Sequence, residues 1–323
     1  GVLRNLARSK QLDAWPVRER APARRLAIEL SHPDFLVARY LERLGEERTR
    51  ALLEANNRPK PLHLLAFRDR GGRGVLAEAL IDEDVEVVPS DIAPQGLKVL
   101  SGNALRTETF RQGGGYVQDE ASQVAALIPP PEPGERILDA AAAPGGKSFS
   151  IVSYEPEARC LLGDVAPGRL GRVRANLRRL KRTMPLLVAD AAAPPFSCGF
   201  DRVVLDLPCS GTGTLRKHPE LKWRVTEEEV DRLAQQGRRL MAAASAAVAP
   251  GGLLVTVTCS LEPEENERVA EGFLATHSGF RRVPLDGLPT SGQPEAIVDE
   301  GQWRLPTGSD HDGFTVSVLE RRS

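Results

Sequence analysis

Short apolar runs alternate with helical patterns from about residue 116 to the end of the chain. Five runs are almost continuously apolar and end at or beside a polar residue: 136–140, 160–164, 185–190, 201–206 and 252–259. Strands that are buried on both faces have this composition, and helical stretches between them are typical of parallel crossovers. We therefore predict an α/β fold in which a parallel sheet carries helices on both faces.

The first 60 residues show a helical pattern. Ser31-His32-Pro33-Asp34 precedes apolar residues at helical spacing, which predicts a capped amphipathic helix that ends at Gly45. A second short helix is expected over residues 46–56, and it ends before Pro59. We interpret residues 1–60 as a helical N-terminal segment.

Residues 61–115 alternate between short strand-like and helical stretches. Strands are expected at 62–66 and 85–88, with a helix at 77–80 between them. The glycine-rich stretches 71–74 and 113–115 predict loops. We predict a small α+β subdomain over residues 61–115 and a catalytic domain over residues 116–323.

Composition and charge limit the class of protein. With 41% hydrophobic and 27% charged residues among 323 positions, the chain has the usage of a globular protein that buries a core without disulfides. Lys and Arg (43) balance Asp and Glu (44), so a nucleic-acid partner would need a local basic face. No apolar run approaches the roughly 20 residues needed to cross a bilayer, so no membrane partner is expected.

Two segments are locally basic. Residues 1–60 hold 13 Lys or Arg against 8 Asp or Glu, which fits either a helical packing module or an RNA-facing one. Residues 159–182 hold eight Lys or Arg against one acid, which fits either a solvated helix face or contacts to phosphates.

Acidic residues follow three successive predicted strands. Asp139 ends the first strand and is followed by Gly145-Gly146-Lys147, a pattern that is neither a P-loop nor a dinucleotide fingerprint and is often only a turn. Asp164 ends the second strand, where a carboxylate can accept both hydroxyls of a ribose, and Asp190 ends the third, where it can meet an adenine amino group. Each acid alone could be a helix cap, but three in a row favour an adenosine-containing cofactor, and S-adenosylmethionine fits best.

The four cysteines are Cys160, Cys198, Cys209 and Cys259, too few for a disulfide framework, and we expect free thiols in a reducing cytoplasm. Cys160 and Cys198 are interpreted as buried packing residues. The chain begins Gly1-Val2-Leu3-Arg4, without an initiator Met or a signal-peptide pattern, so we expect an upstream segment to be missing.

Cys209 and Cys259 directly follow the fourth and fifth predicted strands, at the ligand edge of the sheet. A lone cysteine there is usually a packing residue, and metal binding is disfavoured because neither has a C-x-x-C partner or clustered histidines. A thiol beside S-adenosylmethionine suits methylation at carbon 5 of a pyrimidine, because a thiolate that adds to carbon 6 makes carbon 5 nucleophilic. Asp206, three residues before Cys209, can stabilise the charge that develops near ring N3, and a second thiol can assist release.

Four blocks occur in order along the chain: Gln118-Asp119-Glu120-Ala121-Ser122, Ala143-Pro144-Gly145-Gly146-Lys147, Asp206-Leu207-Pro208-Cys209-Ser210-Gly211 and Thr258-Cys259-Ser260. Together they resemble the RNA cytosine-C5 methyltransferases of the NOL1/NOP2/Sun group, most closely the bacterial Sun/Fmu (RsmB-type) branch that acts on 16S rRNA. The resemblance extends from about residue 31 to the end, including the tail Leu305-Pro306 and His311-Asp312-Gly313-Phe314. It implies a Rossmann-like methyltransferase sheet with S-adenosyl-L-methionine as cofactor.

The resemblance also implies roles for single residues. Cys259 would be the nucleophile, Cys209 would help to release the product, and Asp206 would complete the catalytic set. The cofactor would be held by Ala141, Ala142, Ala143, Pro144, Gly145, Gly146, Lys147, Asp164, Arg169, Asp190 and Asp206, with no metal. Position 141 is Ala where the group commonly has Cys, and Thr315 stands where a second Phe is usual. Only about 30 residues precede the matching stretch, so the helical RNA-binding domain of the group is expected to be absent or reduced to its last helix.

Two segments near the thiols carry further charged residues. Four cations flank the Cys209 loop together with His218 and Trp223: Arg216, Lys217, Lys222 and Arg224. A basic loop with an aromatic residue suits binding of a splayed-out base. His218 itself is interpreted as structural. The five acids of residues 262–271 are expected to cap or solvate a helix, without a chemical role.

The sequence therefore predicts an S-adenosylmethionine-dependent RNA (cytosine-C5-)-methyltransferase (EC 2.1.1.-) that forms a covalent adduct between Cys259 and cytosine carbon 6. Its expected partner is RNA, which the resemblance indicates to be 16S rRNA, and we expect a cytoplasmic monomer without a metal. Three alternatives stay open: another RNA substrate such as tRNA, a non-catalytic RNA-binding or ribosome-assembly factor on the same fold, and methylation of an amino group or a small molecule. The last would want an acceptor motif such as N-P-P-Y, and Asp206-Leu207-Pro208-Cys209 lacks its aromatic residue.

Overall fold

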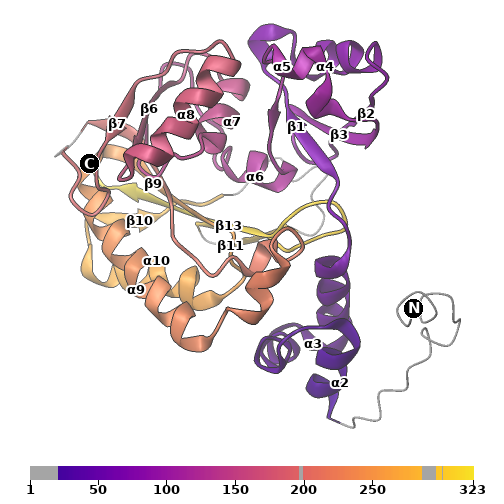
Figure 1. Ribbon diagram of the computed structural model, residues 1–323. Helices are drawn as coiled ribbons and strands as arrows, with labels where there is room; N and C mark the ends of the chain where they lie inside the picture. The colour runs from indigo at the N-terminus through magenta and orange to yellow at the C-terminus, as the bar shows by residue number, and fades with distance from the viewer. Residues whose placement is uncertain (1–20, 196–198, 286–295, 300) are drawn as a thin grey trace, which may run out of the picture. The chain divides into compact units, whose positions relative to one another are not determined.

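The computed structural model describes residues 21–195, 199–285, 296–299 and 301–323 (Figure 1). The start of the chain and Cys198, which the sequence assigns to packing, lie outside the described residues. The contacts divide the chain into two compact units, residues 1–58 and 59–323. No helix in the described part of the chain is both long and apolar enough to cross a membrane.

The described part of the first unit is a pair of helices, α2 (Pro22–Leu30) and α3 (Asp34–Asn57). The predicted break is confirmed, because Gly45 has φ 76° and ψ 172° and divides α3 into two helical stretches. The predicted side-chain cap is wrong: Pro33 is the N-cap residue of α3 and no side chain caps it. Leu26 of α2 and Leu53 of α3 are fully buried, so apolar packing holds the pair together.

The second unit begins with a small antiparallel sheet of order β2-β3-β1-β4. Its elements are β1 (Leu62–Leu65), η2 (Arg68–Arg70), α4 (Gly72–Ile81), β2 (Glu86–Pro89), β3 (Gly96–Ser101), η3 (Ala104–Arg106), α5 (Glu108–Arg111) and β4 (Tyr116–Val117). The strands expected at 62–66 and 85–88 are present, but Gly72 and Gly74 lie in α4 rather than in a loop. Leu64, Leu80 and Leu97 are fully buried and form the centre of a separate small core. We retain residues 61–115 as a proposed subdomain.

The larger sheet has the order β11-β12-β13-β9-β8-β5-β6-β7, with β10 paired to β13. Its strands are β5 (Arg136–Asp139), β6 (Arg159–Asp164), β7 (Leu186–Val188), β8 (Phe200–Asp206), β9 (Val248–Thr258), β10 (Phe280–Arg282), β11 (Ile297–Asp299), β12 (Gln302–Leu305) and β13 (Phe314–Arg321). All five predicted strands are confirmed, and β5 to β9 pair in parallel. The sheet continues through β13, which is antiparallel to β9, so it is mixed rather than parallel throughout.

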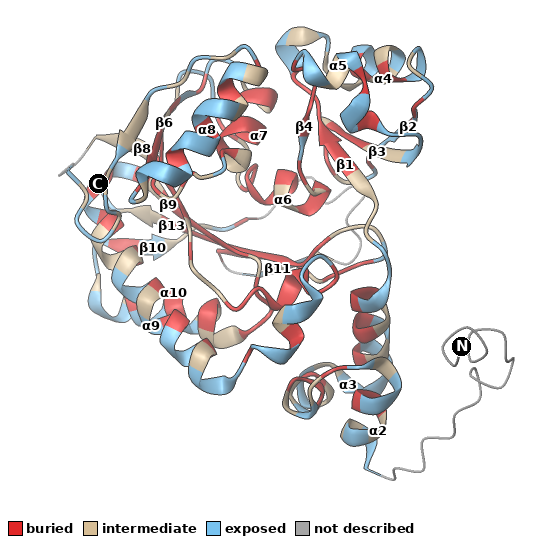
Figure 2. Cartoon of the chain, viewed as in Figure 1, coloured by how far each residue is buried: buried red, intermediate tan, exposed pale blue. Residues whose placement is uncertain are grey.

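Helices cover both faces of this sheet, as expected (Figure 1). They are α6 (Glu120–Ala125), α7 (Gly146–Tyr154), α8 (Pro167–Arg179), α9 (Glu227–Ala244) and α10 (Glu267–Thr276), with the 3₁₀ turns η4 (Thr212–Thr214), η5 (Pro219–Trp223), η6 (Ser245–Ala247) and η7 (Pro263–Glu265). Neighbouring strand residues point to opposite faces: Val204 packs in the core with α7 and α8, whereas Val203 and Leu205 pack in the core with α9 and α10. Figure 2 shows the central strands buried between these two layers.

The strand order decides which side chains meet at the carboxyl edge of the sheet. Along this edge, Cys259 follows β9, Asp206 ends β8, Asp139 ends β5, Asp164 ends β6, and Asp190 lies two residues beyond β7. Ligands of open α/β sheets bind beyond this edge. The fold therefore places the thiol segment and the row of acids side by side on the edge where a ligand would bind.

Candidate active site

The two thiols at the carboxyl edge form a close pair. The Sγ atoms of Cys209 and Cys259 are 3.6 Å apart, and both residues are partly buried. A hydrogen bond from the Cys209 thiol lowers the pKa of Cys259 despite its burial and the nearby Asp206 carboxylate, and the Lys147 cation assists. The same hydrogen bond, together with burial, raises the pKa of Cys209 well above its ordinary value. These directions favour the thiolate form at Cys259 and the protonated thiol at Cys209.

Lys147 lies between the acid row and the thiols. Its Nζ is 2.6 Å from Oδ2 of Asp206, and its side chain is nearly buried. Burial works against the ammonium form, but the neighbouring carboxylates, Asp206 foremost, outweigh it and raise the pKa of Lys147. The structure therefore joins Lys147, predicted only as part of the cofactor loop, to the predicted catalytic residue Asp206, where its charge also favours the Cys259 thiolate.

Backbone contacts fix the two thiol loops against each other. The N–H of Gly213 donates to the carbonyl oxygen of Cys259 at 2.8 Å, and the N–H of Leu261 donates to Oγ1 of Thr212 at 2.9 Å. Gly213 must be glycine, because a Cβ there would lie 2.4 Å from the carbonyl oxygen of Gly313. The loop after β8, the loop after β9 and the segment before β13 therefore form one packed unit.

Glu265 connects the serines that follow the two cysteines. It is buried at 2% exposure, and it accepts from the N–H and the hydroxyl of Ser210 at 2.7 and 2.6 Å. Ser260 also donates a hydrogen bond to this carboxylate, and the hydroxyls of Ser210 and Ser260 are 3.3 Å apart. The expectation that the acids of residues 262–271 cap or solvate a helix is thus wrong for Glu265 and for the fully buried Glu262, because neither is exposed and no side chain caps η7 or α10.

The basic loop after Cys209 divides into buried and exposed residues. Arg216 is buried and donates to the carbonyl oxygens of Gly308 and Ser309 at 2.8 and 2.9 Å, so it holds the chain before β13. The expectation that it faces RNA is wrong, and the same holds for the buried Lys222. Trp223 is 64% exposed and remains able to stack on a base. His218 is exposed and lies 3.6 Å from Glu220.

The loop between β5 and α7 contains the predicted cofactor segment, Ala141 to Lys147. The Ala142 N–H donates to the carbonyl oxygen of Gly163 at 2.8 Å, which attaches the loop to β6. Gly145 has φ 111°, and a Cβ there would lie 2.5 Å from the ring of Phe149, so glycine is required. Below the loop, the Ser148 hydroxyl donates to Asp139 at 2.7 Å, and burial raises the pKa of Asp139 to about 6. The loop carries small side chains up to Gly146, so a ligand can approach its backbone closely.

The remaining predicted cofactor residues lie along the same edge. Oδ1 of Asp164 accepts from the N–H of Ala166 at 2.9 Å and from Nε of Arg169 at 3.0 Å. Asp164 is buried, whereas Asp190 is exposed and accepts from the N–H of Ala192 at 2.8 Å. Arg169 is thus a partner of Asp164 in this structure, and the two acids keep the order along the sheet that a ribose and an adenine would require.

The structure brings the predicted residues to one edge and adds Glu265 to them. The sequence does carry a signal for Glu265, since an acid between the Cys259 segment and the helix that follows it is a candidate for burial, but charge alone favours solvent. Cys160 is buried in the core, as expected. Among the described residues, no cluster of three or more His, Cys, Asp or Glu could hold a metal ion.

Comparisons with known proteins identify the family of the chain. Residues 126–320 match the family model described as 16S rRNA methyltransferase RsmB/F. The chain belongs to this family. Residues 32–106 match a second model, the ferredoxin-like domain of RsmF/B-like methyltransferases, which covers α3 and the strands β1 to β3.

Curated members of the RsmB/F family extend the similarity over most of the chain. The ribosomal RNA small subunit methyltransferase B of Yersinia enterocolitica is 34% identical over 295 residues, and that of Yersinia pestis is 35% identical over the same length. The matches cover 90% of this chain but only 66% of each relative, so the chain spans slightly less than two thirds of their length.

Solved structures share the fold of this RsmB/F family member. The crystal structure of PH0851 is 31% identical, with a TM-score of 0.83 over 96% of this chain and 71% of that one. A methyltransferase homolog from Pyrococcus horikoshii is 25% identical, with a TM-score of 0.74 over 92% of this chain and 97% of that one. NSun6 from the same organism, solved with SFG, is 20% identical with a TM-score of 0.76 over 88% of this chain and 97% of that one, which supports the fold alone. The predicted fold class, a methyltransferase α/β sheet with an N-terminal helical and α+β region, is confirmed.

Proposed function

We propose that this chain transfers a methyl group from S-adenosyl-L-methionine to carbon 5 of a cytosine in RNA, with 16S rRNA as the substrate. The observation that carries the proposal is the thiol pair, Cys209 and Cys259 at 3.6 Å, on the carboxyl edge beside Asp206 and Asp164. Family membership and the names of the curated relatives support the ribosomal substrate.

The residues beside the thiols fit an adenosine-containing cofactor. The backbone of residues 141–146 would lie against the cofactor, because Gly145 and the alanines leave room for close approach. Asp164 uses Oδ1 for Ala166 and Arg169, so Oδ2 is the oxygen that can accept ribose hydroxyls. Asp190 would meet the adenine. When bound, S-adenosyl-L-methionine supplies an electrophilic methyl group.

The first task of the protein is to activate carbon 5. The Cys259 thiolate adds to carbon 6 of the ring, and the electron pair of the carbon 5–carbon 6 bond moves toward N3, which makes carbon 5 nucleophilic. The Asp206 side chain would face N3, and the Lys147 ammonium, 2.6 Å from it, supplies positive charge and a proton source where negative charge develops.

The second task is to release the product after carbon 5 has gained its methyl group. Once the Cys259 sulfur is bonded to carbon, it no longer bears the charge that holds the Cys209 proton, so the pKa of Cys209 is expected to fall from its raised value. Cys209 can then give its proton to solvent and, as a thiolate, accept the carbon 5 proton. The electrons of the carbon 5–hydrogen bond restore the carbon 5–carbon 6 double bond, while the carbon 6–sulfur bond breaks and restores the Cys259 thiolate. Both thiols thus return to their starting forms, and one proton leaves to solvent in each turnover.

The direct test is transfer of tritium from methyl-labelled S-adenosyl-L-methionine to small-subunit rRNA transcribed in vitro, followed by bisulfite sequencing. We expect one labelled cytosine that resists bisulfite conversion. Label on tRNA but not on rRNA would change the substrate, label at a base amino group would contradict the carbon 5 chemistry, and RNA binding without label would favour a non-catalytic assembly factor.

Replacing Cys209 with alanine is expected to slow product release and to raise the pKa of Cys259. The variant lacks the base for the carbon 5 proton, so a covalent protein–RNA species should accumulate on a denaturing gel. It also lacks the hydrogen bond that favours the Cys259 thiolate, so the pH profile of Cys259 alkylation by iodoacetamide should move to higher pH. Cys209→Ser, which keeps a donor, is the matched control for the pH profile. An unchanged profile together with no trapped species would refute both roles of Cys209.

Replacing Asp164 with alanine is expected to weaken S-adenosyl-L-methionine binding by roughly 10- to 100-fold, because hydrogen bonds to a charged group are worth about 1.5–3 kcal/mol. Isothermal titration calorimetry measures the change. Asp201→Ala is the matched control. Asp201 lies near the start of β8, away from the carboxyl edge, and its side chain binds Arg136. Equal cofactor affinity of Asp164→Ala and the parent chain would exclude the ribose role.

A further inference from the structure

The basic segment 159–182 divides into cations that serve packing and cations that do not. Three have structural partners: Arg169 pairs with Asp164, Arg179 donates to the carbonyl oxygens of Phe110 and Gly115, and Arg182 pairs with Asp69. The other five are exposed: Arg159, Arg172, Arg174, Arg178 and Lys181. None of the five forms an ion pair with a carboxylate of the described chain, and the described side-chain partner of Lys181 is the neutral Gln112 at 2.9 Å.

The exposed arginines of α8 lie outside the stripe of the helix that packs on the sheet. Leu170, Val173 and Leu177 are the buried residues of the helix and pack in the core of the large sheet. Arg174 and Arg178 lie one turn apart, about 6 Å along the axis, so they share one side of the exposed surface of the helix, whereas Arg172 lies on another side of it. The surface therefore carries a high density of positive charge without internal neutralisation, which is unusual for a fold of net charge −1.

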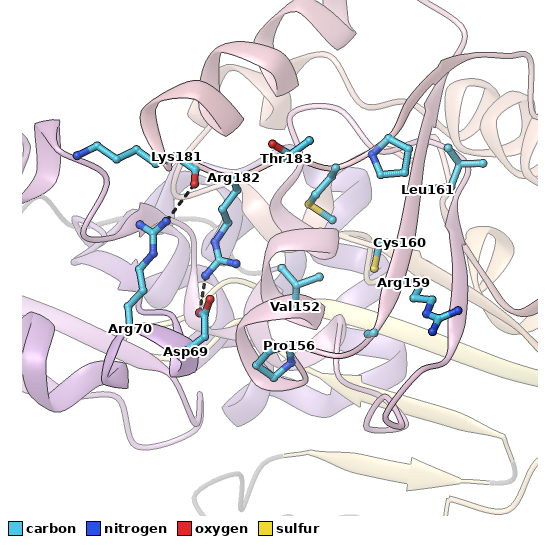
Figure 3. Close-up of a pocket in the computed structure, with 13 residues that line it drawn as sticks. Asp69, Arg70, Val152, Pro156, Arg159, Cys160, Leu161, Lys181, Arg182 and Thr183 are labelled. Atoms are coloured by element: carbon cyan, nitrogen blue, oxygen red, sulfur yellow. Dashed lines mark hydrogen bonds and ion pairs between the residues drawn. The ribbon is translucent and has the colours of Figure 1, made fainter.

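A cavity of about 540 Å³ adjoins the end of this surface (Figure 3). It is lined by Arg70, Arg159, Lys181 and Arg182 against one acid, Asp69. Its other walls are largely apolar and come from the end of α7 and the starts of β6 and β7: Val152, Pro156, Ala158, Cys160, Leu161, Met184 and Pro185. Figure 3 shows Arg182 with Asp69 at one end and Arg159 at the other. Cations around an apolar floor suit a nucleotide, whose phosphate is anionic and whose base is flat and apolar on its faces.

The cavity is distinct from the catalytic edge. Arg159 begins β6 and Asp164 ends it, so the cavity and the cofactor residues lie at opposite ends of one strand, about 17 Å apart. Neither thiol and none of the acids of the carboxyl edge lines it. A ligand in the cavity would thus not compete with the cofactor, whereas an extended polymer could reach both along α8, which begins near Asp164 and ends near Lys181.

We propose that the exposed arginines of α8 and the adjoining cavity bind the sugar-phosphate backbone of the RNA that flanks the target nucleotide. The proposal rests on the proposed function for the identity of the polymer, and on charge complementarity for its location. Guanidinium groups without an acidic partner bind phosphates while releasing counterions, so this contact supplies affinity that depends on salt and not on sequence. The site thereby orients the RNA, and base recognition remains at the thiol edge.

The test compares RNA affinity across salt concentrations for the full chain and the variant Arg172→Ala/Arg174→Ala/Arg178→Ala. The probe is unmodified small-subunit rRNA transcribed in vitro. Losing three phosphate contacts should weaken binding at least about tenfold near physiological salt and reduce the slope of log affinity against log salt by about 2 to 3. Arg159→Ala/Lys181→Ala tests the cavity, with an expected slope change of about 1 to 2.

The matched control is Arg238→Ala/Arg239→Ala on α9, on the opposite face of the sheet. Both arginines are exposed and have no ion pair with a described residue. Circular dichroism and the thermal midpoint confirm folding of every variant. Methyl transfer below saturating RNA should fall in the α8 variant in proportion to its weaker binding, and it should stay within about twofold of the parent in the α9 control.

The outcomes separate this proposal from the proposed function. Methyl transfer by the parent chain together with unchanged RNA affinity of the α8 variant would overturn the proposal and leave the function intact. RNA binding that depends on the α8 arginines, in a chain that transfers no methyl group, would support this proposal and contradict the proposed function. Equal losses in the α8 and α9 variants would show that only total charge matters, and polyglutamate that displaces RNA at equal charge concentration would assign the surface to an acidic protein; either result would overturn the proposal.

Discussion

Replacing Cys259 with alanine is expected to lower methyl transfer to rRNA by at least about 10⁴-fold, the scale of loss that follows removal of a covalent nucleophile. The partner thiol of Cys209 is a poor replacement nucleophile, because burial and the carboxylates of Glu265 and Asp206 still raise its pKa when Cys259 is absent. The affinities for RNA and for S-adenosyl-L-methionine should stay within about threefold, since Cys259 contributes chemistry and not ground-state binding.

Adduct formation distinguishes the two thiols in the same experiment. RNA that contains 5-fluorocytidine should trap the covalent species on the parent chain, because fluorine cannot leave carbon 5 as a proton does. We expect the adduct with Cys209→Ala, which is the matched control, and none with Cys259→Ala. An adduct on Cys259→Ala that disappears in Cys209→Ala would exchange the assignments, and full methyl transfer by Cys259→Ala would end the covalent mechanism altogether.

The parallel half of the sheet can be predicted because its strands are buried on both faces and are therefore continuously apolar. Ile137-Leu138 and Val203-Val204-Leu205 are such runs, and the acids that end them, Asp139 and Asp206, belong to one edge of any parallel sheet built from these strands. The antiparallel strands β10 to β12 carry no comparable run. Ile297 is exposed and Arg304 is only partly buried, so their pairing depends on neighbours that local patterns do not reveal.

Charged residues are the main source of wrong expectations. Arg216 and Glu265 are expected in solvent because charged side chains usually are, yet both are buried with backbone or hydroxyl partners. Those partners are distant along the chain: Gly308 is 92 residues from Arg216, and Ser210 is 55 residues from Glu265. Burial of a charge is decided by such long-range partners, so the motifs can identify the thiols but not the side chains that hold them in register.

Replacing Glu265 with alanine is expected to lower kcat about 100-fold and to destabilise the fold by about 2–4 kcal/mol, because the N–H and hydroxyl of Ser210 lose their buried acceptor. Ser210 follows Cys209 and Ser260 follows Cys259, so without the carboxylate the distance between the two sulfur atoms is no longer fixed. Urea unfolding and steady-state kinetics measure the two effects. Glu271→Ala, an exposed acid of α10 in the same acidic stretch, should change neither.

Glu265→Gln separates position from charge. The amide oxygen can still accept from the Ser210 N–H, so the register of the loops should persist. Burial raises the pKa of Glu265 in the folded protein, although the hydrogen bonds from Ser210 oppose this shift. The folded protein therefore loses stability as the pH rises from the ordinary pKa of a glutamate to the raised one. Glutamine does not ionise, so Glu265→Gln should remove this pH dependence. The pKa of Cys209 is raised mainly by the hydrogen bond to Cys259 and by burial, and the Glu265 charge makes a smaller contribution. Glu265→Gln removes only that contribution, so the pH profile of Cys209 alkylation should move to slightly lower pH. Activity near that of the parent in Glu265→Gln, beside a large loss in Glu265→Ala, is the result expected of a positioning residue; an equally large loss in both would mean that the negative charge itself is required at the thiol pair.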